Sequence, residues 1–230
     1  LDPAILGGRP ISLLPIVPSQ LPGLIDWVSR HPDVKIDNVI IGGAPLSPQA
    51  ERSLLSPLPF HPYATYGMTE TCSHVAVRPL SVPDAPFVAM PGVTFDIDPG
   101  RGSLAISSSG YSFRRLVTND AVTLLSPTSF RWLGRIDHVI NSGGIKLHPE
   151  ILERKISPAI PRPFYLTSEP SEKWGEQLLL VVEGTDLDLP AILDACRTLL
   201  PPSHCPRRAV ALPSLPRTSS GKILRKRLTD

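Results

Sequence analysis

The stretch "KIDNVIIGGAPLS" (residues 35–47) predicts the centre of the fold, because an apolar strand runs directly into a glycine turn and then into a helix. Ser47 and Pro48 suit the residue before a helix and its first turn, respectively. A second apolar strand is predicted at residues 11–17, followed by apolar residues at helical spacing between 21 and 28. Alternating strands and helices favour an α/β core, in which ligands bind at the carboxyl ends of parallel strands. The glycine turn is therefore a candidate wall of a binding site.

Two further regions follow this core. Residues 60–134 carry mostly short β signals separated by Gly, Pro and Asn-Asp turns, which favours an antiparallel sheet or a small barrel appended to the core. After Gly134, a hairpin, a short helix, a strand, an amphipathic helix and a last strand predict a compact α+β domain. We therefore expect a larger domain at residues 1–136 and a smaller one at residues 137–230.

Composition limits the class of protein. The 230 residues are 41% hydrophobic and carry a net charge of +2, which suits a buried core in one or two domains. Aromatic residues make up 6% and do not alternate with basic residues, so nucleic acid is not an expected partner. No apolar run approaches the about 20 residues of a membrane span, and the first residues do not form a signal peptide. A start without Met suits an internal cut of a longer chain.

The metal-binding and redox residues carry little pattern. Cys72, Cys196 and Cys205 form no CxxC pair, so neither a disulfide framework nor a structural zinc site is predicted. Free, buried thiols in a reducing cytosol are expected, which favours a cytoplasmic protein. The six histidines show no ligand spacing such as HExxH. The sequence therefore predicts no site for a transition metal.

The stretch "LPRTSSGKILRKRL" (residues 215–228) places Lys222 after a Ser/Gly turn. A Walker phosphate loop needs a Gly five positions before its Gly-Lys pair and a Ser or Thr after it. Those positions hold Pro216 and Ile223, so this type of loop is excluded. The basic residues 225–227 are expected to form a solvated tail.

A second group of polar residues lies in "YATYGMTET" (residues 63–71), directly after a predicted strand. Tyr66 can stack on a base, the Thr69 hydroxyl can bind a phosphate oxygen, and the Glu70 carboxylate can hold Mg²⁺. The alternative is an ordinary turn with a capping Thr, which helix N-termini often carry.

Three charged residues are ambiguous by themselves. Asp120 follows a tight turn and can accept hydrogen bonds from the two hydroxyls of a ribose, although Asn-Asp is also a common turn. Arg135 and Asp137 suit either a surface ion pair or an anion contact beside a pivot between domains. Residues 106–112 are rich in Ser and Gly but contain no lysine, so they predict no phosphate loop.

Taken together and in this order, five segments resemble the adenylate-forming superfamily of acyl-CoA and aryl-CoA synthetases, peptide-synthetase adenylation domains and luciferases. The segments are GGAPLS (42–47), YGMTE (66–70), TNDAV (118–122), GRIDHVINSGGIKLHPEILE (134–153) and PRTSSGKILR (216–225). The resemblance implies the C-terminal portion of a large α/β adenylating domain, followed by a small mobile α+β domain. The family's upstream loop for the β and γ phosphates is absent, so the chain is expected to be part of a longer ligase or a reduced protein.

The resemblance also implies the roles of individual residues. ATP and AMP would be bound by Gly43, Ala44, Pro45, Tyr66, Gly67, Asp120 and Arg135. Thr69 would bind the adenylate phosphate, Glu70 would hold Mg²⁺, and Lys222 would reach the substrate carboxylate and the α-phosphate. Asp137 would lie at the hinge of the small domain, and Gly143–Gly144 would flank the path of the CoA thiol.

The implied reaction has two steps. A carboxylic acid attacks the α-phosphate of ATP to give an acyl adenylate, and CoA then forms the thioester. The hinge segment and the C-terminal half most resemble bacterial o-succinylbenzoate-CoA ligases of menaquinone synthesis. Two alternatives stay open: a non-catalytic module that binds an adenylate or acyl-CoA, and an amino-acid-activating domain that loads a carrier protein.

Overall fold

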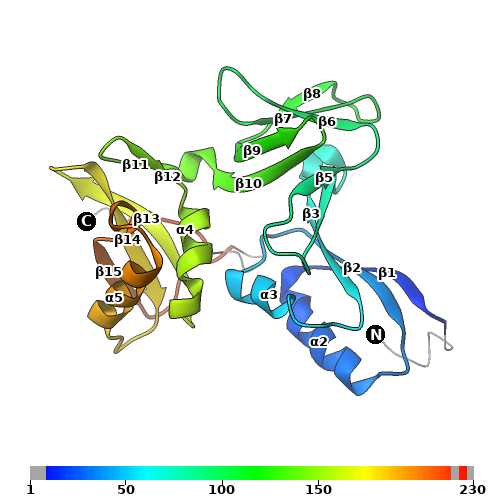
Figure 1. Ribbon diagram of the computed structural model, residues 1–230, viewed down its shortest axis with the longest axis horizontal. Coiled ribbons are helices and arrows are strands. Elements are labelled where there is room, and N and C mark those ends of the chain that lie inside the picture. The colour runs from blue at the N-terminus through cyan, green and yellow to red at the C-terminus, as the bar shows by residue number, and fades with distance from the viewer. Residues whose placement is uncertain (1–8, 219–222, 227–230) are drawn as a thin grey trace. The chain divides into compact units, whose positions relative to one another are not determined.

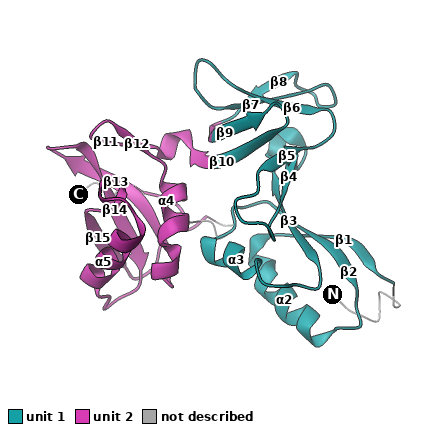
Figure 2. Cartoon of the chain, viewed as in Figure 1, with its two compact units in different colours: residues 1–118, 122–132 teal, residues 119–121, 133–230 magenta. Residues whose placement is uncertain are grey.

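The computed structural model describes residues 9–218 and 223–226. The chain forms two compact units (Figure 2): unit 1 comprises residues 1–118 and 122–132, and unit 2 comprises residues 119–121 and 133–230. The predicted division at residue 136 falls inside unit 2, whose longer segment begins at Leu133. In this unit the backbone N–H of Ile136 donates to the carbonyl of Asn119 at 3.0 Å. The assignment of separate roles to the two predicted domains stays a prediction.

A seven-stranded sheet has the order β1-β2-β3-β4-β5-β10-β9 (Figure 1). Its first three strands pair in parallel and the next ones antiparallel. The strands are β1 (Ile11–Ile16), β2 (Ile36–Ile41), β3 (His61–Tyr66), β4 (Ala76–Pro79), β5 (Phe87–Ala89), β10 (Ser129–Arg135) and β9 (Asp120–Ser126). The helices α2 (Leu21–Arg30) and α3 (Pro48–Ser53) alternate with the parallel strands along the chain, as predicted.

The core of unit 1 follows from the apolar spacing in these elements. Leu21, Leu24 and Val28 lie on the buried face of α2 and pack in one cluster with Val39 and Ile41 of β2. The Ser47 hydroxyl accepts a hydrogen bond from the Ala50 N–H at 3.1 Å and so caps α3, as its sequence position predicts.

The β-rich region divides between two sheets. Strands β6 (Val93–Ile97), β7 (Leu104–Ser108) and β8 (Arg115–Val117) form a separate antiparallel sheet, as expected for an appended β element. The strands β4, β5, β9 and β10 instead extend the core sheet. Phe130 of β10 is fully buried and packs with Phe95 of β6, so one cluster serves both sheets.

Over its described residues, unit 2 is built on a five-stranded sheet with the helices α4 and α5. Its elements are β11 (Ile140–Ser142), β12 (Ile145–Leu147), α4 (Pro149–Ile156), β13 (Phe164–Ser171), β14 (Gly175–Glu183), α5 (Leu189–Leu199) and β15 (Arg208–Leu212). The sequence predicted all of these except β13. Short 3-10 helices lie at Pro18–Gln20, Thr69–Thr71, Ile136–His138, Ser157–Ala159 and Pro202–His204. In the described ranges, every helix is too short or too polar to cross a lipid bilayer.

The central strand β14 is buried on both faces. Leu178, Leu180 and Val182 pack with residues of α4 and α5. The alternate residues Leu179 and Val181 pack in a second cluster, which also contains Leu215 and the half-buried Ile223. Helices therefore cover one face of this strand, and the C-terminal segment contributes to the cover of the other.

The three cysteines are free thiols, but the prediction that they are buried is wrong for Cys72, which is exposed. Burial raises the pKa of Cys196 to about 11 and also raises the pKa of Cys205, whereas Cys72 is exposed. Because the thiolate is the reactive form, we expect a chromogenic disulfide reagent at pH 8 to label one thiol of the folded chain rapidly. The same reagent should label all three after denaturation. Rapid labelling of Cys196 in the folded chain would contradict this packing.

Candidate functional site

The parallel strands bring two predicted motifs to one edge of the core sheet. Strands β2 and β3 run side by side, with Ile41 opposite Ala64 in the register. The chain leaves β2 at Gly42 and leaves β3 at Gly67, so the turns at residues 42–47 and 67–70 emerge next to each other. This is the carboxyl edge, at which parallel sheets bind ligands.

Two glycines shape these turns. Gly43 has a φ of +82°, which favours glycine because a side chain is strained in this region. At Gly67 the chain folds back on itself, and the Val75 N–H donates to the Tyr66 carbonyl at 2.8 Å. A Cβ at position 67 would lie 2.1 Å from the backbone oxygen of Ser73. The tight return of the chain therefore requires Gly67.

The polar residues after β3 are presented to solvent. The turn is capped by Thr71, whose hydroxyl accepts a hydrogen bond from the Met68 N–H at 2.9 Å. Thr69 and Glu70 are exposed. The half-buried Tyr66 ring packs edge-on against Phe130, with centroids 5.0 Å apart. The Thr69 carbonyl accepts from the Cys72 N–H at 3.2 Å, but the side-chain cap comes from Thr71, so the side chains of the predicted phosphate and Mg²⁺ residues do not close the turn.

In unit 2, the predicted ribose residues come from adjacent backbone segments. The hydrogen bond between Ile136 and Asn119 joins the start of β9, at Asp120, to the end of β10, at Arg135. Asp120 is buried, with 7% of its surface exposed. Arg135 Nε donates to Asp137 Oδ1 at 3.3 Å. Partial burial acts to raise the pKa of Asp137, but the hydrogen bond and charge of Arg135 lower it below its usual value.

Gly143 and Gly144 form the two-residue turn of the hairpin between β11 and β12. Both have positive φ, +59° and +84°, as a type I′ turn requires. The ring of Trp174 lies against Gly143, where an added Cβ would be 2.6 Å from Cε3 of the indole. Lys173 Nζ and the guanidinium carbon of Arg207 lie 4.8 and 5.9 Å from its ring centroid. The sequence did not indicate this tryptophan, because its contact with Gly143 and its exposed fraction of 38% are visible only in the fold.

Lys222 and the three residues before it lie outside the described residues, whereas the chain up to Thr218 and from Ile223 to Lys226 is described. Arg217 and Ile223 form an antiparallel bridge, and the Leu224 N–H donates to the Pro216 carbonyl at 2.8 Å. The prediction of a solvated basic tail is wrong for Arg225, whose side chain is 20% exposed and paired with a buried carboxylate of α4. Lys226 is exposed, and Arg227 lies outside the described residues.

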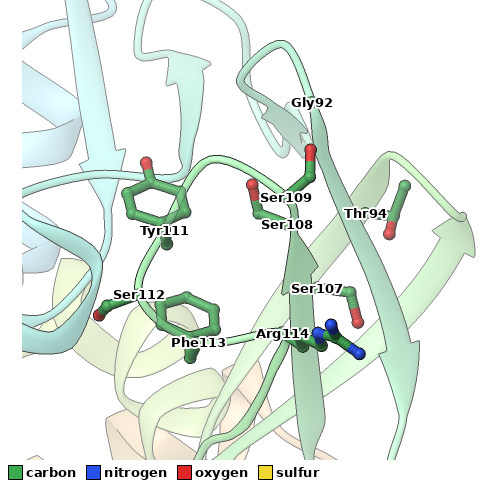
Figure 3. A pocket seen from close by; sticks show the side chains of 9 residues that line it. All are labelled: Gly92, Thr94, Ser107, Ser108, Ser109, Tyr111, Ser112, Phe113 and Arg114. Atoms are coloured by element: carbon green, nitrogen blue, oxygen red, sulfur yellow. The ribbon is translucent and has the colours of Figure 1, made fainter.

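A pocket of about 680 Å³ lies in unit 1 at the ends of β6 and β7 (Figure 3). It is lined by Gly92, Thr94, Ser107, Ser108, Ser109, Tyr111, Ser112, Phe113 and Arg114. None of the predicted site residues lines it. Much of the wall comes from the Ser-rich residues 106–112, for which the sequence predicts no phosphate loop. The pocket is therefore separate from the candidate site described above.

No family model matches the chain. Over 95% of its length, the chain is 26% identical to the 2-succinylbenzoate-CoA ligase of Staphylococcus epidermidis, of which it covers 51%. Among solved structures, it matches o-succinylbenzoate CoA synthetase (MenE) from Bacillus subtilis in complex with the acyl-adenylate intermediate OSB-AMP. That match has a TM-score of 0.78 and 22% identity, and it covers 99% of this chain and 52% of the synthetase. ATP-bound MatB from Rhodopseudomonas palustris matches with a TM-score of 0.74 and 22% identity, over 97% of this chain and 52% of MatB.

The chain spans about half the length of the curated relatives it matches. The matches confirm the predicted resemblance and the predicted fold class, which is that of the C-terminal portion of such enzymes.

Proposed function

We propose that this chain, which has the fold of the C-terminal portion of the adenylate-forming enzymes, is the corresponding part of an AMP-forming acid-CoA ligase. One observation carries the proposal: the turns at residues 42–47 and 66–70, which resemble the family's adenine and phosphate motifs, emerge together at the carboxyl edge of β2 and β3. The substrate proposed first is o-succinylbenzoate, for menaquinone synthesis, because 2-succinylbenzoate-CoA ligases are among the curated relatives. The unpaired thiols favour a cytoplasmic location.

In the first step, a carboxylate substrate attacks the α-phosphate of ATP and pyrophosphate leaves. The adenine would lie against Gly43, Ala44 and Pro45, with Tyr66 stacked on it. The ribose hydroxyls would donate to Asp120, and Arg135 would add a cationic contact. The side chains of Thr69 and Lys222 would bind the phosphate whose charge grows in the transition state, an interaction worth several kcal/mol when it is preorganised. Gly67 would keep the backbone close enough for these contacts.

Glu70 suits Mg²⁺, because its carboxylate is exposed beside the phosphate motif and hard cations prefer oxygen ligands. When bound there, the ion would offset negative charge on the phosphates of ATP. In the second step, the CoA thiol attacks the acyl carbon and AMP leaves. We assign Gly143 and Gly144 to the path of the thiol and Asp137 to the hinge between the two steps.

Trp174 extends the proposed CoA face. An exposed indole with the cationic groups of Lys173 and Arg207 over its ring suits an adenine ring and phosphates, since bases stack on aromatic side chains and on guanidinium planes and cations attract phosphate. We therefore expect Trp174→Ala to raise the KM for CoA at least about fivefold, the lower end of the loss for one stacking contact. Steady-state kinetics of thioester formation measures this change. If Trp174→Ala slowed acyl-adenylate formation as much as thioester formation, the substitution would instead have damaged unit 2 in general.

The proposal is tested by ATP-pyrophosphate exchange with the complete protein, screened over aromatic and aliphatic acids and amino acids. AMP release is then compared with and without CoA. Exchange that depends on an aromatic acid, with AMP release that depends on CoA, supports the acid-CoA ligase. Exchange with an amino acid and no effect of CoA would point to carrier-protein loading. Binding of an acyl adenylate without any exchange would identify a non-catalytic module.

A further inference from the structure

Arg225 is held in a buried bidentate ion pair. Both oxygens of Glu153 accept hydrogen bonds from it, Oε1 from Nη1 and Oε2 from Nη2, the latter at 2.6 Å. Glu153 is 7% exposed, and its Oε1 also accepts from the Leu166 N–H at 2.7 Å. Such a pair fixes the direction of the guanidinium as well as its position.

The surrounding contacts hold the chain after Lys222 in register. Arg225 Nε lies 3.8 Å from Oε1 of Glu150, a second buried carboxylate of α4. The Tyr165 hydroxyl donates to the carbonyl of Lys226 at 3.3 Å. Burial raises the pKa of the Glu153 carboxyl, and the charge and hydrogen bonds of Arg225 act against this rise. The pair therefore supports the ionised form of a carboxylate that burial alone would disfavour.

The chain before Lys222 is held by a separate carboxylate. Oε2 of Glu183, on β14, accepts from the Leu215 N–H at 2.9 Å and from Arg217 Nη2 at 3.1 Å. Both sides of the lysine segment are thus bonded to the same unit, through side chains of β14 and α4. After the lysine, Arg225 supplies the charged side-chain contact and lies three positions from it.

We propose that Arg225 is a positioning residue for Lys222: its ion pair with Glu153 fixes the chain after the lysine and so sets where the lysine acts in adenylation. This inference rests on the proposed function. Stability alone does not explain a buried ion pair, because well-packed apolar residues in its place are often neutral or stabilising. Ile223 already provides an apolar anchor two residues earlier. An apolar contact tolerates sliding, whereas a bidentate pair defines one register.

The decisive variant replaces both partners with apolar residues, Glu153→Leu with Arg225→Met, so that no unpaired charge is left in the core. Hydrogen exchange of the intact chain, followed by mass spectrometry, reports the anchor directly. We expect the Leu224 amide, which donates to Pro216, to exchange at least about tenfold faster, as in a locally opened segment. The amides of β14 should keep their protection. The variant Arg225→Lys keeps the positive charge but cannot form the bidentate pair. In this variant the Leu224 amide should exchange at a rate between those of the wild type and the double variant.

Kinetics of the complete protein test the positioning role. In the double variant, the kcat for acyl-adenylate formation should fall about 100-fold, the scale expected when a catalytic group is misplaced by about 1 Å. The KM values for ATP and acid should not change, nor should thioester formation from supplied acyl adenylate. Arg208→Met, which removes the partner of Glu169 elsewhere in unit 2, should leave both half-reactions unchanged.

The outcomes separate the two proposals. Unchanged exchange at Leu224, or an equal loss of both half-reactions, would overturn the positioning role of Arg225. Full adenylation activity with a loosened segment would overturn it as well. A wild-type protein that shows no acid-dependent exchange overturns the proposed function and the role in adenylation with it. The hydrogen-exchange result still decides whether Arg225 anchors the segment.

Discussion

Lys222→Ala in the complete protein is expected to lower the rate of acyl-adenylate formation by about 1,000-fold, because a preorganised cation that stabilises a transition state is worth several kcal/mol. The second step needs no positive charge at the phosphate. Thioester formation from supplied acyl adenylate and CoA should therefore stay within about twofold of the wild type, within the ordinary range for a surface substitution. Pyrophosphate exchange measures the first rate, and thioester formation from synthetic acyl adenylate measures the second.

The matched control is Lys155→Ala, which removes an exposed lysine from α4 of the same unit. It should leave both rates unchanged. An equal loss of both half-reactions in Lys222→Ala would show that this lysine supports the structure or both steps alike, and the proposed division of roles would be wrong.

Gly67→Ala is expected to destabilise unit 1 by about 3 kcal/mol, at the upper end for overpacking, because the added methyl meets backbone atoms that cannot rotate away. The ideal Cβ lies 2.1 Å from the Ser73 carbonyl oxygen and 2.6 Å from His74 Cα. Relief requires the turn after β3 to open, which would also move Tyr66 and Glu70. Urea unfolding followed by circular dichroism measures the loss of stability.

Gly23→Ala provides the comparison in the same unit. This glycine lies within α2, and a Cβ there would meet no atom within 4 Å. The substitution should stabilise the chain by up to about 1 kcal/mol, since alanine is the better helix former. If both variants change stability equally, the close approach at Gly67 is not the cause.

Local signals in the sequence predicted most of the fold. The turn after β2, the cap at Ser47 and the glycine hairpin between β11 and β12 each depend on a few neighbouring residues, so their patterns could be read directly. Strand β13 was missed because Glu169 and Pro170 interrupt its apolar pattern. Every residue of β13 pairs with a residue of β14, and this pairing makes the segment a strand although its own residues do not indicate one.

Motifs in the sequence predict the candidate site residues, which stay predictions, whereas the contacts that the sequence did not indicate join residues far apart in the chain. Glu153 and Arg225 are separated by 72 positions. Within its own segment Arg225 is one of several basic residues, and that pattern is typical of a solvated face. Trp174 was missed for a similar reason, because its contact with Gly143 comes from the pairing of β11 with β14.

The double cover of β14 has a consequence for how this protein changes over evolutionary time. Leu215 and Ile223 pack on Tyr165, Leu179 and Val181, so deletion of the C-terminal segment would open a hydrophobic face of unit 2 to water. If the proposed function holds, selection for folding would preserve the residues on both sides of Lys222 even in a descendant that had lost adenylation. In such a lineage the lysine itself could change while the residues around it persist, so under the proposed function the identity of this side chain would report catalysis more sensitively than the segment around it.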